Sequence, residues 1–184
     1  MHRNMIRTLV VIGLVLAAGT VVGKGRTVRI LITGTGIAES LEITDPDIVR
    51  SFFVYTGPGV RINGQQVHTR PEGQPGAFID WPKGRVQHRP TGLRRFEVGF
   101  YCEGSANWLC YKATYEYDPA CTEGYMYLPG REDDRYRRNV STIVHGVEGN
   151  WFHSSPMWER LVRPRIEQAR REPAAPRTRF ITPI

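Results

Sequence analysis

The sequence lacks the patterns that identify many enzymes outright. It has no G-x-S-x-G nucleophile elbow, and its three cysteines never fall in a C-x-x-C spacing, which removes the usual ligand set of a structural zinc site. Gly34 and Gly36 follow an apolar stretch, as in a dinucleotide fingerprint, but Glu39 stands where the third glycine belongs. We therefore expect a tight turn at this place, and no metal or cofactor.

The middle of the chain has no excess of charge of either sign. The formal net charge is +7, but residues 1–25 contribute three cations without an acid, and residues 158–184 contribute seven arginines against three glutamates. The body between them, residues 26–157, holds 15 basic and 15 acidic residues. A nucleic-acid-binding face needs a concentrated basic patch, so we expect no nucleic-acid partner.

Long hydrophobic runs are absent except near the N-terminus, where an apolar stretch covers Leu9–Val22 behind two arginines. It is shorter than the roughly 20 apolar residues of a spanning helix, and its length and flanks are typical of a secretory signal peptide. Cleavage is expected after Gly19 or Gly23. An anchor over 1–23 that stays uncleaved is the alternative, because positive residues also follow the stretch. The sequence thus predicts an exported protein, periplasmic or extracellular.

Beyond this segment, residues 26–171 are expected to form a single β-rich domain. The last residues, 172–184, are rich in proline and arginine and are expected to be a disordered tail. Membrane contact is expected only through an uncleaved N-terminal segment or this basic tail.

Local patterns predict the elements of the domain. Asp45 and Ser155 are suited to cap helices that begin with proline, and Pro164 is expected to divide the second of these. Residues 61–92 have little periodicity and are expected to form a long loop. Strands are expected over Thr27–Thr33, Leu41–Thr44, Phe52–Tyr55, Ala77–Trp81, Tyr125–Leu128 and Asn139–His145.

The clearest element is a hairpin over Leu93–Tyr117, in which apolar and polar residues alternate on both arms. Matching the apolar faces fixes a register. It pairs Phe96 with Tyr115, Val98 with Ala113, Phe100 with Tyr111 and Arg95 with Glu116. Extended to the turn, this register puts Cys102 and Cys110 on opposite faces. We therefore expect no bond between them, and a disulfide between Cys110 and Cys121 if one forms.

Together these elements predict an α+β fold: a mainly antiparallel β-sheet, curved or sandwich-like, with a C-terminal helix packed on it.

One cluster of residues suits catalysis. His145, Glu148 and His153 are two imidazoles and a carboxylate near each other in sequence, which could serve acid–base chemistry or hold a catalytic metal. Their spacing matches no metal signature, and histidines at a strand end or before a helix more commonly cap or form simple hydrogen bonds.

Five tyrosines form the second candidate site. In the register above they share one face, where they either pack as core or form an exposed platform for a ligand. They are Tyr111, Tyr115, Tyr117, Tyr125 and Tyr127.

The sequence therefore favours a non-catalytic envelope protein that binds a protein, peptide or glycan partner. A small exported hydrolase or metal-dependent enzyme that uses His145, Glu148 and His153 is the alternative. Exposure of several tyrosines side by side would favour the first function, and convergence of the three candidate catalytic side chains would favour the second.

Overall fold

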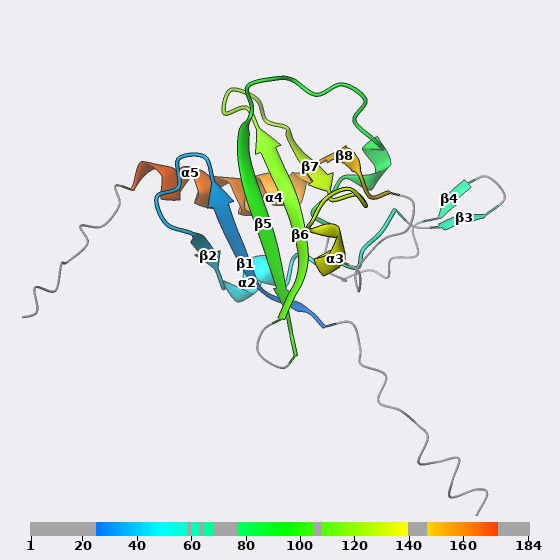
Figure 1. Cartoon of the computed structure of the whole chain (residues 1–184), viewed down its shortest axis with the longest axis horizontal. Helices are drawn as coiled ribbons and strands as arrows, with labels where there is room; N and C mark the ends of the chain where they lie inside the picture. Colours follow the sequence, from blue (N-terminus) through cyan, green and yellow to red (C-terminus); the bar gives the residue numbers. More distant parts are fainter. Residues whose placement is uncertain are drawn as a thin grey trace, which may run out of the picture.

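The protein is an α+β fold with an open antiparallel sheet and a bent C-terminal helix (Figure 1). The computed structural model describes residues 25–58, 60–62, 65–67, 77–104, 108–139 and 147–172. The six strands of the main sheet are β1 (Thr27–Gly34), β2 (Leu41–Ile43), β5 (Arg94–Cys102), β6 (Trp108–Tyr117), β7 (Gly124–Leu128) and β8 (Asn150–His153). Their order across the sheet is β2-β1-β5-β6-β7-β8, and every neighbouring pair is antiparallel.

The remaining elements are short. A separate hairpin joins β3 (Val60–Ile62) to β4 (Gln65–Val67). The helices are α2 (Pro46–Val49), the 3₁₀ helix η1 (Trp81–Lys83), α3 (Tyr136–Asn139), α4 (Pro156–Leu161) and α5 (Arg163–Arg171).

The hairpin of β5 and β6 has the register that the alternation predicts. Phe96 stands opposite Tyr115, Val98 opposite Ala113, Phe100 opposite Tyr111 and Arg95 opposite Glu116. The inward side chains of both strands are fully buried, which confirms that burial of one face sets the pairing.

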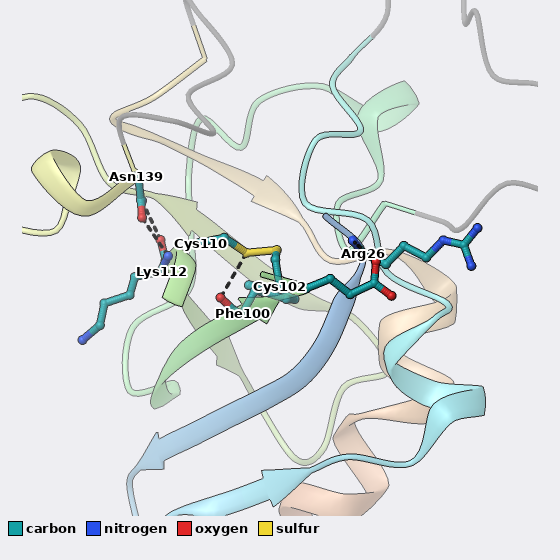
Figure 2. Close-up of a disulfide and its surroundings, with 7 residues drawn as sticks. Arg26, Phe100, Cys102, Cys110, Lys112 and Asn139 are labelled. Atoms are coloured by element: carbon teal, nitrogen blue, oxygen red, sulfur yellow. Dashed lines mark hydrogen bonds between the residues drawn. A yellow bond between two sulfur atoms is a disulfide. The ribbon is translucent and has the colours of Figure 1, made fainter. Parts of the chain in front are cut away.

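The disulfide expectation was wrong, because the register changes near the turn. Beyond Phe100 and Tyr111 the pairing continues with Tyr101 opposite Leu109, so Cys110 is the extra residue of a β-bulge. The bulge brings Cys110 to the face of Cys102, and the two are bonded, with Cα atoms 5.9 Å apart (Figure 2). Cys121 is an exposed free thiol, so the expected Cys110–Cys121 bond is absent.

The core lies between the inner face of the sheet and the C-terminal helices, which pass behind β5 and β6 in Figure 1. Trp158 of α4 is its centre, with ring centroids 5.2 Å from Phe52, 5.6 Å from Tyr115 and 6.0 Å from Phe100. Val162 and Ile166 continue the buried stripe. Because contacts of this kind replace water around large apolar surfaces, they supply most of the stability of the fold.

Both expected helix caps are present. The Asp45 carboxylate accepts a hydrogen bond from the Asp47 backbone N–H (3.0 Å), and the Ser155 hydroxyl accepts one from the Trp158 N–H (3.1 Å). The division near Pro164 is also confirmed, since α4 ends and α5 begins on either side of Val162.

Two other expected strands are reduced to isolated bridges. Phe52–Tyr55 forms no strand of the main sheet, and its apolar side chains Phe52 and Val54 pack directly into the core. Among the described residues of 61–92 are the end of β3, β4 and η1, and the strand expected at Ala77–Trp81 is reduced to a single bridge between Ile79 and Ser154. The strand β8 was not expected at all.

The irregular segment 79–86 runs along the outer edge of β8. The backbone N–H of Asp80 donates to the His153 carbonyl (2.9 Å), and that of Val86 donates to the Trp151 carbonyl (2.8 Å). Arg85 also forms a bridge with Phe152. This edge of the sheet is therefore covered, whereas the opposite edge is the three-residue strand β2.

Several expectations concern residues outside the described part of the chain. They are the signal peptide or anchor over 1–23, most of the tail over 172–184, and the strand over Asn139–His145 beyond its first residue, Asn139, which ends α3. Within the ranges that the structure describes, no helix has the length and apolar character needed to cross a bilayer.

Candidate functional site

The candidate site is a cleft of about 620 Å³ at the end of the sheet where β6 turns into β7. Its walls come from three parts of the chain: Lys83 at the end of η1, the turn residues 121–123, and Ser154 to Arg163 around α4. A cleft of this size is in the range of small-molecule and peptide pockets.

The Glu159 carboxylate is the centre of the hydrogen bonds in this cleft. It accepts hydrogen bonds from the Tyr115 hydroxyl (2.9 and 3.0 Å) and from the Ser154 hydroxyl, and it pairs with the Arg163 guanidinium at 3.0 Å. Burial, followed by the neighbouring Glu159 charge, raises the pKa of Tyr115 well above its usual value. Tyr115 is therefore a neutral donor, and all of these groups are satisfied by one another.

Gly124 makes this close packing possible. A Cβ atom at this position would lie 2.6 Å from the Glu159 Oε1 and 2.6 Å from the Tyr115 Cε2. The first residue of β7 must therefore lack a side chain for the carboxylate to reach the tyrosine.

Arg163 fastens the turn between β6 and β7 to the helices. Its Nη2 donates to the backbone carbonyls of Asp118 (2.8 Å) and Cys121 (2.6 Å), and its guanidinium lies 4.4 Å from the Tyr117 ring centroid. Planar guanidinium groups are suited to such combined hydrogen bonding and stacking. The wall of the cleft that holds Cys121 is thus fixed by its backbone.

The opposite rim is an ion pair. Lys83 donates to Glu123 at 2.6 Å, and this hydrogen bond raises the pKa of Lys83 and lowers that of Glu123. His153 Nδ1 lies 3.5 Å from the second oxygen of Glu123, and the ring of His153 is 5.4 Å from that of Tyr125. The rim side chains are partly exposed, so the pair orients groups more than it stabilises the fold.

Two further groups of the cleft remain open to a ligand. Arg160 is exposed, and the structure records no partner for it among the residues it describes. The exposed Cys121 thiol lies 3.8 Å from the Asp118 carboxylate. The thiol therefore contacts an acid rather than an imidazole base.

The histidine–carboxylate cluster is not brought together by its described members. Glu148 lies in the turn before β8, where it accepts a hydrogen bond from the Val147 N–H (3.3 Å), and His153 ends that strand beside Glu123. His145 lies outside the described residues. Over the part of the chain that is described, no three histidine, cysteine, aspartate or glutamate residues gather as metal ligands.

The five tyrosines do not share one face. Tyr111, Tyr115 and Tyr117 point into the core and are buried, whereas Tyr125 and Tyr127 are half-buried on the opposite face of the sheet. The reason is the β6–β7 register, which places Tyr115 opposite Met126 and so turns both later tyrosines outward.

The outward rings are partly covered by arginines. The Arg135 guanidinium lies over Tyr127 (5.9 Å) and that of Arg89 over Trp151 (4.0 Å), and the rings of Tyr127 and Trp151 are 5.1 Å apart. Arg89 is paired with the buried Glu116 and Arg135 with Asp133. Of the two outward tyrosines, Tyr125 lies near the rim of the cleft, with its ring 5.4 Å from that of His153.

No family model, curated protein or solved structure matches the chain. The function is therefore inferred from the geometry of the cleft alone.

Sequence reasoning missed Lys83, Glu123, Glu159 and Arg163. These residues belong to different elements, and none of them falls in a local motif. The one available signal was the helix face that carries Glu159 and Arg163 four residues apart, which is an ordinary spacing for an ion pair.

Proposed function

We propose that the protein is an exported, non-catalytic binding module whose cleft holds a carboxylate-bearing peptide segment of a partner protein. The observation that carries this proposal is the state of the charges around the cleft. Glu159 and Glu123 already pair with Arg163 and Lys83, while Arg160 stands exposed at the rim with no recorded partner in the described chain. The unpaired charge is positive, so an anionic group is the complementary ligand.

Binding is favoured over catalysis by the way the acids and bases are occupied. Glu159 accepts from two hydroxyls and one guanidinium, which leaves it poorly placed to take a proton from a substrate. Ser154 donates to that carboxylate and has no imidazole partner recorded, and the Cys121 thiol faces Asp118. Such nucleophiles are usually activated by an adjacent imidazole, and among the described residues of the cleft no imidazole is recorded in contact with Ser154 or Cys121.

A peptide is favoured over a glycan by the coverage of the aromatic face. Sugar rings bind on open, flat aromatic surfaces, but Trp151 and Tyr127 have guanidinium groups over them. The cleft offers instead a mixture of charged rim groups, the pyrrolidine ring of Pro156 and the side chain of Thr122. Such a mixture suits an extended chain with acidic side chains or a terminal carboxylate.

Export itself is supported by two features. The N-terminal stretch reads as a secretory signal, and the Cys102–Cys110 disulfide is compatible with an oxidising compartment.

The test is a titration of the labelled protein with short oligoglutamate and, separately, oligolysine, followed by amide NMR shifts. We expect oligoglutamate to shift resonances of the turn 121–123 and of α4, and Arg160→Glu to abolish the shifts. Arg131→Glu changes another exposed arginine, which lies outside the cleft, and is the matched control. Equal shifts with both peptides, or equal loss in both variants, would contradict the proposal.

A second experiment searches for the natural partner. Cys121 is the only cysteine outside the disulfide and it lines the cleft, so a benzophenone maleimide attached to it places a photocrosslinker there. We expect adducts in the native envelope that disappear with Arg160→Glu. The control carries the same label on Arg131→Cys in a Cys121→Ser background, and identical adducts from both positions would count against the cleft.

A further inference from the structure

The described residues Tyr101–Gly104 and Trp108 form the tip of the β5–β6 hairpin, and the chain enters the domain beside them. The Arg26 carbonyl accepts a hydrogen bond from the Glu103 N–H (2.8 Å), and the Arg26 N–H donates to the Glu103 carboxylate (3.4 Å). Gly25 packs so closely that an added Cβ would lie 2.5 Å from the Glu103 carbonyl oxygen. Figure 2 shows Arg26 beside the disulfide that closes the hairpin. The start of the folded chain is therefore fixed to this tip.

The apolar N-terminal stretch ends only a few residues earlier. Val22 precedes Arg26 by four positions, and four extended residues span at most about 14 Å. Wherever the apolar stretch is held, the hairpin tip must lie within that distance of its end.

The surface of the tip carries groups that suit a lipid interface. Trp108, which begins β6, is 36% exposed and is the one exposed large hydrophobic residue in the part of the chain whose burial is described. Nearby, the Arg29 guanidinium lies 3.8 Å from the Tyr101 ring centroid. Tryptophan and tyrosine are enriched where membranes meet water, and arginine reaches from there to lipid headgroups.

We propose that, in the chain that keeps its N-terminal segment, the tip of the β5–β6 hairpin is a lipid-contact surface in which Trp108 enters the headgroup region. The segment over Leu9–Val22 is the apolar anchor, and the short connection to Arg26 leaves the tip no position away from the bilayer. This inference does not depend on the peptide-binding role of the cleft.

The contact also sets the orientation of the domain. Strand β6 runs from Trp108 at the tip to Tyr117, next to the turn that lines the cleft. Nine steps along a strand cover about 30 Å. In Figure 1 the tip and the β6–β7 turn lie at opposite ends of the sheet. The membrane contact therefore points the cleft away from the bilayer, where a partner can reach it.

The test uses the full chain in vesicles of phosphatidylcholine and phosphatidylglycerol, with or without brominated acyl chains that quench tryptophan. The N-terminal 24 residues contain no tryptophan, so the signal reports on the domain alone. We expect quenching in the brominated vesicles, loss of that quenching in Trp108→Phe, and its retention in Trp151→Phe, the matched control. Far-UV circular dichroism confirms that both variants fold. Unchanged quenching in Trp108→Phe would overturn the proposal.

A second variant separates true contact from mere closeness. A Gly/Ser linker of about 20 residues between Gly23 and Lys24 loosens the tether to a mean span of about 25 Å. If the tip has its own affinity for the interface, quenching of Trp108 persists with the linker. A fall to the level of Trp108→Phe shows that the tether alone held the tip there, and refutes a lipid-contact surface.

Discussion

Cys110 shares its place opposite Phe100 with Tyr111, and this doubled position turns its sulfur toward Cys102. The bulge and the disulfide therefore depend on each other. The extra residue turns Cys110 to the same face of the sheet as Cys102, and the bond then joins two residues eight positions apart in the sequence. Buried at 0% exposure, both sulfurs belong to the core.

Removing this bond lowers stability without changing the fold. A disulfide that closes a loop this short stabilises the folded protein by roughly 2–3 kcal/mol, mainly because it restricts the unfolded chain. We expect Cys102→Ala with Cys110→Ala to lower the free energy of unfolding in urea by about that amount. Cys121→Ser should leave it unchanged, because Cys121 is exposed and free. Native protein should react with one equivalent of a thiol reagent, and a peptide map that links Cys121 to either partner would disprove the pairing.

Glu159 is a second stabilising centre. Replacing it with alanine leaves the buried Tyr115 hydroxyl without its acceptor and removes the carboxylate partner of the Arg163 guanidinium. We expect Glu159→Ala to cost about 2–4 kcal/mol of unfolding free energy, and Glu159→Gln to cost less because one acceptor oxygen remains. Urea unfolding measures both, and equal losses in the two variants would show that hydrogen bonding is not the cause.

Gly124 provides a test of the close approach at the start of β7. An alanine there would meet Glu159 and Tyr115 at 2.6 Å, so we expect Gly124→Ala to destabilise by about 1–3 kcal/mol. In a Glu159→Ala background the same change should cost less, because one of the two obstacles is gone. Thermal unfolding of the two single variants and the double variant gives the coupling; strict additivity would mean that the contact with Glu159 is unimportant.

Acid should weaken the contact between α5 and the sheet. Burial opposes the charge of Glu167, but the Tyr117 hydrogen bond and the charges of Arg94 and Arg170 together lower its pKa below the usual 4.5. Because the pKa of Glu167 is lower in the folded than in the unfolded chain, its ionised form contributes stability that is complete above the unfolded pKa. That stability is lost as the pH falls through the folded pKa. We expect Glu167→Gln to flatten the pH dependence of unfolding below about pH 4.5. An unchanged acid limb would show that other carboxylates control it.

Alkaline pH should also weaken the contact between Tyr117 and Glu167, in this case through ionisation of the tyrosine. Burial, and then the hydrogen bond to Glu167, raises the pKa of Tyr117 to about 12. Because the folded pKa is raised, the contribution is complete below the unfolded value near 10 and is lost as the pH rises toward 12. We expect Tyr117→Phe to reduce the loss of stability over this range, measured by urea unfolding at several alkaline pH values.

The sequence was sufficient for the elements whose partner lies next in the chain. The β5–β6 register followed from alternation, and both helix caps followed from Asp45 and Ser155 before a proline. The bulge at Cys110 could not be foreseen from the sequence. The alternation of apolar and polar residues continues through it, but beyond the extra residue the side chains of β6 point to the opposite faces of the sheet.

Elements with distant or weak partners were harder to predict. Phe52–Tyr55 has strand-forming residues, yet it forms no strand, because Phe52 packs against Trp158 and both Phe52 and Val54 are buried in the core. Tyr125 and Tyr127 were placed on the wrong face because nothing in the sequence fixes how β7 pairs with β6. The cleft was missed for the same reason: Lys83, Glu123 and Glu159 come together only after three separate segments fold.

The covered edge of β8 has a consequence for how copies of this protein behave in a crowded compartment. Strands at the border of a sheet can recruit strands from other molecules and so start polymers. Here one border is paired with residues 79–86, and the other is the three-residue strand β2, with Glu42 exposed at its middle. Among the described strands of the main sheet, no long border remains as a template, so we expect concentrated protein to resist edge-to-edge polymerisation even though its sheet is open.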